Sequence, residues 1–264
     1  MGVNERWKWS AVPALLMLGM AGCVSVPDMQ WSTTKGPEIV EGKETGLLII
    51  EVNEKGEYFD KDQFARMRDW LAKDDAPVVL FVHGWHHNAK RDDENLLEFK
   101  DLLQKVQAKT DSPIKGIYVG WRGDQSDPVI PLPQALGDFL TFNARKNASV
   151  VVGRNKLKEI VDHLASFGDS RNVVLIGHSL GGSALYYAAE DVVAQPLNDH
   201  MEVILLNPGV GVRELKNGKL GPALAPALSG EQLAGVQALR SAESAPSPAF
   251  APKGADTIAA TKGL

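Results

Sequence analysis

The feature that most constrains the fold is a serine set between glycines at the end of an apolar run. Residues 173–176 are all apolar, and residues 177–181 read Gly-His-Ser-Leu-Gly directly before an Ala-rich segment. A strand that leads through so tight a turn into a helix has no room for side chains at Gly177 and Gly181. The pattern predicts a strand–turn–helix unit with Ser179 at its tip.

Such a turn presents Ser179 above the carboxyl end of its strand and at the N-terminus of the following helix. Backbone N–H groups at a helix N-terminus stabilise negative charge, so the Leu180 N–H is predicted to donate to an oxyanion. His178 precedes the serine, and this Gly-His-Ser resembles that of many lipases, which implies a structural side chain that points away from Ser179.

Strand and helix patterns alternate along the chain, which predicts an α/β domain with a mostly parallel sheet flanked by helices. Largely apolar strands are predicted at 46–52, 77–82, 114–121, 173–176 and 201–206. Helices are predicted at 62–73, 92–108, 156–167 and 182–194. The pattern loosens between residues 121 and 155, where only residues around 135–142 are modestly helical. For this segment a cap over the site and a plain connection both stay open.

A second motif, His-Gly-Trp at 83–85, directly follows the strand 77–82. Together the two motifs resemble the α/β-hydrolase superfamily, and most closely its serine lipase/esterase-like members. The resemblance implies that Ser179 is catalytic. It also implies an oxyanion loop at Gly84, with the Trp85 N–H as the second donor.

The resemblance implies a triad in the order serine, acid, histidine. Downstream of Ser179 the chain has His200, just before the last predicted strand and therefore at the wrong end of the sheet for a base. Glu214 is expected to be a solvated charge, and Asp256 lies in a low-complexity tail. The triad acid and base are thus not identified, and the C-terminal strands of the fold are expected to be missing or replaced.

His83, His86 and His87 cluster after the second motif and could suggest a metal site. No carboxylate or cysteine stands at a matching helical spacing, so we expect no metal and no cofactor. His83 is expected to pack and hydrogen-bond within its loop.

Length and charge narrow the function classes further. A chain of 264 residues with 44% apolar content can bury one substantial core. A net charge of −5 and a pI near 5.7 give no basic surface for nucleic acid, so none is expected as a partner.

Cys23 is the one cysteine of the chain and follows a short apolar run with basic residues before it. These features predict a secretory signal peptide, since a bilayer span needs about 20 apolar residues. Ala-Gly before Cys23 resembles the lipobox of bacterial lipoproteins, which implies lipidation of Cys23 and an envelope location, with the outer membrane favoured by Val24. A signal peptide with a chance cysteine is the alternative.

Four segments are therefore expected. They are a signal peptide (1–22), a lipid-anchored tether (23–45), an α/β-hydrolase-like domain (46–216) and a low-complexity tail (217–264). The tail is rich in Ala, Pro and Ser and contains no run that predicts a buried strand.

Two functions stay open. The first is a membrane-anchored serine hydrolase acting on small-molecule or lipid esters, and a peptidase or thioesterase would share its machinery. The second is a catalytically incomplete hydrolase-fold lipoprotein that serves as a binding module, because a serine without a base is a poor nucleophile. The sequence does not predict the oligomeric state.

Overall fold

The computed structural model describes residues 32, 35–40, 45–110, 112–123, 134–193, 200–211 and 257–260. Within these residues seven strands form one sheet in the order β1-β2-β4-β3-β5-β6-β7. They are β1 (Glu38–Ile39), β2 (Gly46–Val52), β3 (Val78–Val82), β4 (Lys115–Trp121), β5 (Val173–His178), β6 (Met201–Leu206) and β7 (Thr257–Ala260). The central strands β2, β4, β3, β5 and β6 are parallel, and the two edge strands are antiparallel to their neighbours.

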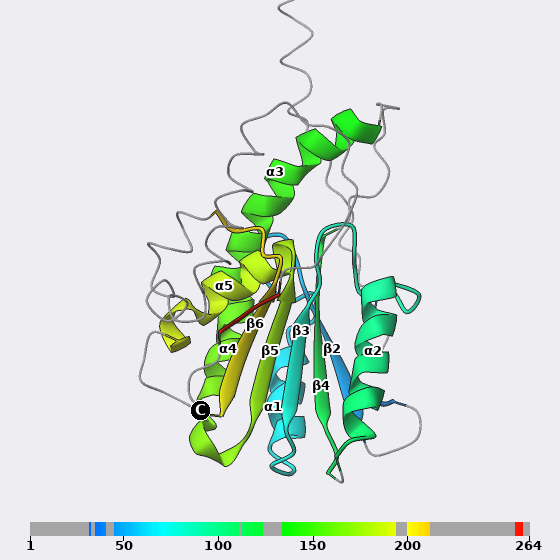
Figure 1. The fold of residues 1–264 in the computed structure, drawn as a ribbon, viewed down its shortest axis with the longest axis vertical. Helices are drawn as coiled ribbons and strands as arrows, with labels where there is room; N and C mark the ends of the chain where they lie inside the picture. Colours follow the sequence, from blue (N-terminus) through cyan, green and yellow to red (C-terminus); the bar gives the residue numbers. More distant parts are fainter. Residues whose placement is uncertain are drawn as a thin grey trace, which may run out of the picture.

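Helices cover both faces of this sheet (Figure 1). They are α1 (Gln63–Leu71), α2 (Glu94–Gln107), α3 (Gln134–Val152), α4 (Lys158–Ala165) and α5 (Leu180–Val193). The described core residues of α2 pack on one face, and those of α1, α3, α4 and α5 pack on the other. No helix in the described ranges is long and apolar enough to cross a bilayer.

The central strands are largely apolar because both of their faces are covered. Every residue of β4 is buried, and so are four of the five residues of β3. Successive side chains of β4 alternate between the two faces of the sheet and enter two separate hydrophobic clusters. Ile117 and Val119 belong to one cluster, and Tyr118 belongs to the other. The α/β architecture and the mostly parallel sheet are as predicted from the sequence.

The segment between 121 and 155 is more helical than predicted. A helix was expected there only around 135–142, but α3 extends to Val152 and continues through a π-helical turn, Gly153–Leu157, into α4. β-Branched residues and a glycine weaken the local helix signal. Packing overrides it, because the Ser149 hydroxyl lies 3.1 Å from that of Ser183 on α5 and Val152 is fully buried.

Within the π-helical turn, Asn155 departs from helical geometry with φ −110° and ψ −108°. Gly153 lies against α5 so closely that a Cβ atom there would collide with the Ala184 carbonyl oxygen. The chain in this way joins α3 and α4 while both pack against α5.

The tail supplies one short edge strand, β7, where no run that predicts a buried strand was found. Residues 257–260 pair antiparallel with β6, and Ile258 stands opposite Leu205. Four residues are too short for a periodic signal, and an edge strand needs only backbone hydrogen bonds to one neighbour. The predicted signal peptide and most of the predicted tether and tail lie outside the described residues.

Candidate active site

Ser179 forms the turn between β5 and α5, with a φ of +52°. A non-glycine residue in this left-handed region stores of order 1–3 kcal/mol of strain, and such residues gather at functional sites. The Ser179 N–H donates to the Leu206 carbonyl (2.9 Å), and the Ser179 carbonyl accepts from Gly209 (2.8 Å) and Ser183 (3.1 Å). The strained turn is therefore bonded both to the end of β6 and to its own helix.

The two glycines that flank Ser179 stand where backbones meet. A Cβ atom on Gly177 would lie 2.8 Å from the Gly182 Cα, and one on Gly181 would collide with the Val82 and His83 carbonyl oxygens. The start of α5 therefore rests directly on the end of β3. The structure thus brings the two sequence motifs together at the carboxyl edge of the sheet.

Gly84 is the closest point of the second motif to the serine. A Cβ atom on Gly84 would lie 3.0 Å from the Ser179 Cβ and 3.1 Å from the His178 Nδ1. Backbone amides of Trp85 and Leu180 flank this contact. Within the described part of the chain neither of these two N–H groups is used in a hydrogen bond.

His83 is buried under the loop as a neutral side chain. Its Nδ1 lies 2.9 Å from the Gly84 carbonyl oxygen, and its Nε2 lies 2.9 Å from the Trp121 backbone nitrogen. A carbonyl only accepts and an N–H only donates, so these partners fix the proton on Nδ1. Burial lowers the pKa of His83 to about 4. The Trp121 indole N–H in turn donates to the His83 carbonyl (2.8 Å).

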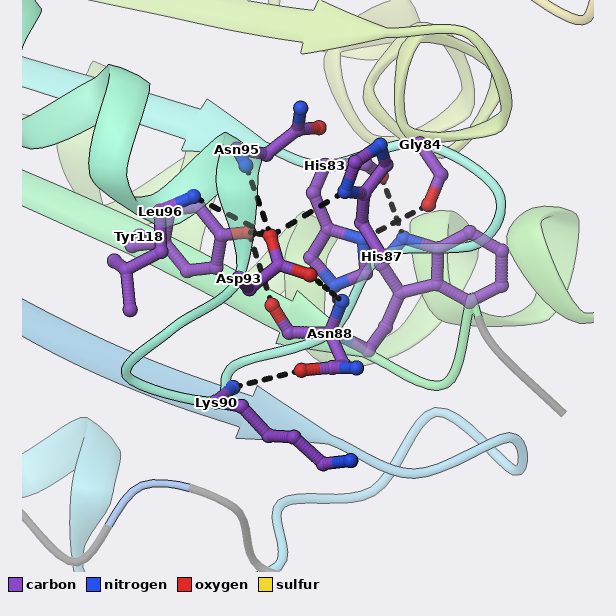
Figure 2. A network of polar contacts seen from close by, with 10 residues as sticks. His83, Gly84, His87, Asn88, Lys90, Asp93, Asn95, Leu96 and Tyr118 are labelled. Carbon is purple, nitrogen blue, oxygen red and sulfur yellow. Dashed lines mark hydrogen bonds and ion pairs between the residues drawn. The ribbon is translucent and has the colours of Figure 1, made fainter. Parts of the chain in front are cut away.

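Asp93 holds the other end of the loop (Figure 2). Its Oδ1 accepts from the N–H groups of Asn95 (3.0 Å) and Leu96 (3.4 Å), which caps α2, and from the Tyr118 hydroxyl (3.4 Å). Its Oδ2 accepts from the Asn88 N–H at 3.0 Å. One carboxylate thus joins the loop, α2 and β4.

His87 also contacts Asp93, with 3.4 Å between its Nδ1 and the Asp93 Oδ1. The hydrogen bond to Asp93 raises the pKa of His87, and the charges of Glu94 and Glu98 act in the same direction. The same contact with His87, together with the Asn88 N–H, holds the pKa of the Asp93 carboxyl below its usual range although burial opposes this.

The remaining histidines divide between the two ends of the molecule. His178 is half-buried beside Gly84, and burial lowers its pKa. His200 lies at the opposite edge, where its carbonyl accepts from the Val173 N–H and its ring contacts Asn172. His200 therefore stands at the amino end of β6, as its sequence position indicated, and away from Ser179. His163 packs between Phe64 and Phe167.

Aromatic side chains border the site. The Trp85 ring stacks on the exposed His86 with 4.0 Å between centroids and meets Phe142 of α3 edge-on at 5.3 Å. His86 has a φ of +65°, which makes it a second strained residue of the site. Helix α3 extends beyond the carboxyl ends of the strands (Figure 1), and its contact with Trp85 favours a cap over a plain connection.

Among the described residues no group of three or more His, Cys, Asp or Glu side chains is arranged to hold a metal ion. The three clustered histidines do not converge, since His83 uses both ring nitrogens and His87 turns to Asp93. Cys23, Glu214 and Asp256 lie outside the described residues.

Sequence reasoning missed the role of Asp93. The sequence did carry a signal for this role. Asp93 stands three positions before Leu96, where the apolar face of the helix begins, and aspartate is a typical N-cap at such a position. Its second set of contacts, to Asn88 and Tyr118, depends on tertiary structure and leaves no local pattern.

A family model described as alpha/beta hydrolase of unknown function (DUF900) matches residues 61–220, more than half of the 264-residue chain. The matched segment includes the loop at Gly84 and the turn at Ser179. Searches of curated proteins and of solved structures gave no match. With a parallel sheet, a strained serine between strand and helix, and this family match, the chain belongs to a family of α/β hydrolases of unknown function.

Proposed function

We propose that this chain is a serine hydrolase that acts on carboxylic esters, with Ser179 as its nucleophile. The observation that carries the proposal is the meeting of two motifs. Ser179 sits at φ +52° between β5 and α5, and Gly84 lies against its Cβ. Strain at one serine, beside a loop whose amides are unused, is the arrangement that acyl transfer requires.

In the proposed reaction the Ser179 oxygen attacks the ester carbonyl carbon and its proton passes to a base. The carbonyl oxygen becomes an oxyanion, which accepts hydrogen bonds from the N–H groups of Trp85 and Leu180. The base then returns this proton to the ester oxygen, and the alcohol leaves as the tetrahedral intermediate collapses to an acyl-enzyme, which water hydrolyses in a second step. Loss of one such donor typically costs about 3 kcal/mol of transition-state stabilisation.

The aromatic border favours an ester with an apolar portion. Trp85, which follows Gly84 in the loop, forms an edge-to-face pair with Phe142, and Phe142 is 37% exposed. An apolar acyl or alcohol group packed there would remove this surface from water at roughly 25 cal/mol per Å². Small aryl esters and lipid esters both meet this description.

A fluorophosphonate probe, which phosphonylates activated serines, tests the proposal. We expect labelling of the native chain at Ser179, and a loss of labelling of at least about 1000-fold in Ser179→Ala. Ser183→Ala is the matched control, because the Ser183 hydroxyl contacts Ser149, and the backbone hydrogen bond from Ser183 to the Ser179 carbonyl is kept in the variant. A folded native chain that is not labelled, or labelling that survives in Ser179→Ala, would contradict the proposal.

One observation favours the second candidate, a hydrolase-fold binding module. All six histidines of the chain are among the described residues, and no hydrogen bond joins any of them to the Ser179 hydroxyl. A bound ester that is not turned over, with its affinity reduced by Phe142→Ala, would support this candidate over the enzyme.

We also propose that Cys23 is lipidated and anchors the chain in a bacterial cell envelope, with the outer membrane favoured. The support is the sequence around Cys23, where small residues separate a short apolar run from the cysteine. Radiolabelled palmitate should be incorporated in the native chain and not in Cys23→Ser. Equal incorporation in both, or none in the native chain, would refute the anchor.

A further inference from the structure

Asp93 makes more hydrogen bonds than the end of a helix needs. An N-cap carboxylate normally accepts from one or two amides of its own helix, as Asp93 does from Asn95 and Leu96. Its second oxygen instead accepts from Asn88, five residues back in the loop. The Tyr118 hydroxyl links the same two places, since it donates to the Asn88 carbonyl at 3.0 Å and lies 3.4 Å from Asp93.

The loop is therefore fixed at both of its ends. At its start, His83 donates to the Gly84 carbonyl and is itself held by Trp121. At its end, Asp93 holds Asn88. The intervening residues include His86 with its positive φ, and a strained residue persists only when its surroundings determine it from both sides.

The peptide between Gly84 and Trp85 is the part of the loop that matters for chemistry. It is trans, so its N–H points opposite to its C=O. Since His83 binds the C=O, the Trp85 N–H is directed away from His83. Gly84 meanwhile presents its Cα to the Ser179 side chain. A rotation of this peptide would remove the donor from the site.

We propose that Asp93 is a positioning residue for this donor: by clamping the loop onto α2 and β4, it keeps the Trp85 N–H directed at the oxyanion that forms on Ser179. This inference rests on the proposed hydrolase function. Asp93 touches neither the substrate nor the reacting atoms and acts through the loop backbone.

The clamp also has an ionic component. His87 faces the carboxylates of Asp93, Glu94 and Glu98 at the start of α2. The charge of His87 in turn lowers the pKa of His83 and of His178. When His87 is protonated, its contact with Asp93 is an ion pair, so the clamp is strongest below the raised pKa of His87 and weakens as pH rises through it.

Two substitutions separate the clamp from the helix cap. In Asp93→Ser the hydroxyl still caps α2 but is too short to hold Asn88 and His87 as well. In Asp93→Asn the side-chain oxygen still caps α2, but the NH2 group in place of the second oxygen cannot accept from the Asn88 N–H, and the charge facing His87 is lost. Asp60→Ser is the matched control, because Asp60 accepts from Asp62 at the start of α1 and pairs with Arg66.

The experiment measures hydrolysis of a p-nitrophenyl ester, affinity for an arylboronic acid, and thermal unfolding. The boronic acid forms a tetrahedral adduct with the serine and therefore reports on the oxyanion donors. In Asp93→Ser we expect kcat to fall at least about tenfold and boronate affinity to fall by a similar factor, with KM within about twofold and a Tm close to that of Asp60→Ser. In Asp93→Asn, which removes the ion pair, we expect kcat to fall as well and to lose the alkaline decline that the pair causes. Unchanged kcat and boronate affinity in Asp93→Ser would overturn the proposal.

Amide hydrogen exchange of residues 84–88 distinguishes failure of this inference from failure of the proposed function. If the native chain neither hydrolyses esters nor reacts with a fluorophosphonate, the proposed function fails and exchange tests the clamp by itself. Faster exchange of 84–88 in Asp93→Ser than in Asp60→Ser supports the clamp. Equal exchange in the two variants overturns it, whatever the activity of the native chain.

Discussion

The two ends of the parallel strands are built on different principles. At the carboxyl edge lie all three non-glycine residues with positive φ among those described, namely His86, Ser179 and Asn207. At the amino edge, in contrast, two buried cations close the end of α1. Lys115 donates to the Trp70 carbonyl at 2.8 Å, and Arg171 donates to the Leu71 carbonyl at 2.9 Å.

The two ends of the strands therefore have different roles, with stabilising contacts at the amino edge and the candidate reactive groups at the carboxyl edge. The amino edge satisfies the carbonyls left open at a helix C-terminus with positive charge, which stabilises the fold. The carboxyl edge stores strain and holds a neutral His83 under a loop with unused amides. Substitutions at the amino edge should therefore change the free energy of unfolding and leave the reactivity of Ser179 as it is. Substitutions at the carboxyl edge should change both the free energy of unfolding and the reactivity of Ser179.

The largest expected effect is a pH dependence of stability that originates at His83. Its folded pKa of about 4 lies below the ordinary value of 6.5, so the unfolded chain binds a proton between these pH values and the folded chain does not. Stability is therefore full above pH 6.5 and falls by about 3 kcal/mol as pH drops to 4. Urea unfolding of the native chain and of His83→Gln across this range isolates the contribution. If the free energy of unfolding changed with pH in the same way in the native chain and in His83→Gln, His83 would not be the cause of the pH dependence.

An intermediate effect is expected at the amino edge from Arg171→Met. The substitution removes the Arg171 hydrogen bonds to the carbonyls of Leu71 and Asp74, leaving the Leu71 carbonyl only a longer contact with Lys115 (3.5 Å), while retaining apolar bulk against Phe167. We expect a loss of about 2 kcal/mol in the free energy of unfolding, with fluorophosphonate labelling of Ser179 unchanged. Arg66→Met, which removes a partly exposed ion pair, should cost about 0.5 kcal/mol or less. Slower labelling in Arg171→Met would show that the two edges are coupled.

The smallest effect is a gain of stability at the serine. Glycine adopts positive φ freely, whereas alanine retains the strain, so Ser179→Gly should be about 1 kcal/mol more stable than Ser179→Ala. Neither variant should react with the probe. Equal unfolding free energies for the two would mean that the turn at φ +52° carries no measurable strain.

Much of the sheet could be predicted because its signals are local. The strand 173–176, the glycines at 177 and 181, and the position of His200 all follow from pattern and order in the chain. The meeting of Gly84 with Ser179 could be expected only through the family resemblance. Periodicity within one segment does not report which strands are neighbours.

The parts that escaped prediction depend on contacts distant in the sequence. Helix α3 is long because Ser149 and Val152 pack on α5, and nothing in its own composition demands that length. The second carboxylate oxygen of Asp93 finds Asn88 only once the loop has folded over Tyr118. Strand β7 is specified by pairing with β6 more than by its own four residues.

The π-helical turn between α3 and α4 has a consequence for helical phase. A π turn holds one residue more than an α turn, and each residue advances an α-helix by about 100°. The extra residue at the irregular Asn155 lets Val152 before it and Ile160 and Leu164 after it all face the core. Deleting Asn155 would therefore let α3 run into α4 as a regular helix with Ile160 and Leu164 still on the core side, whereas straightening the turn with Asn155 retained would rotate α4 by about 100° and carry its apolar stripe away from the core.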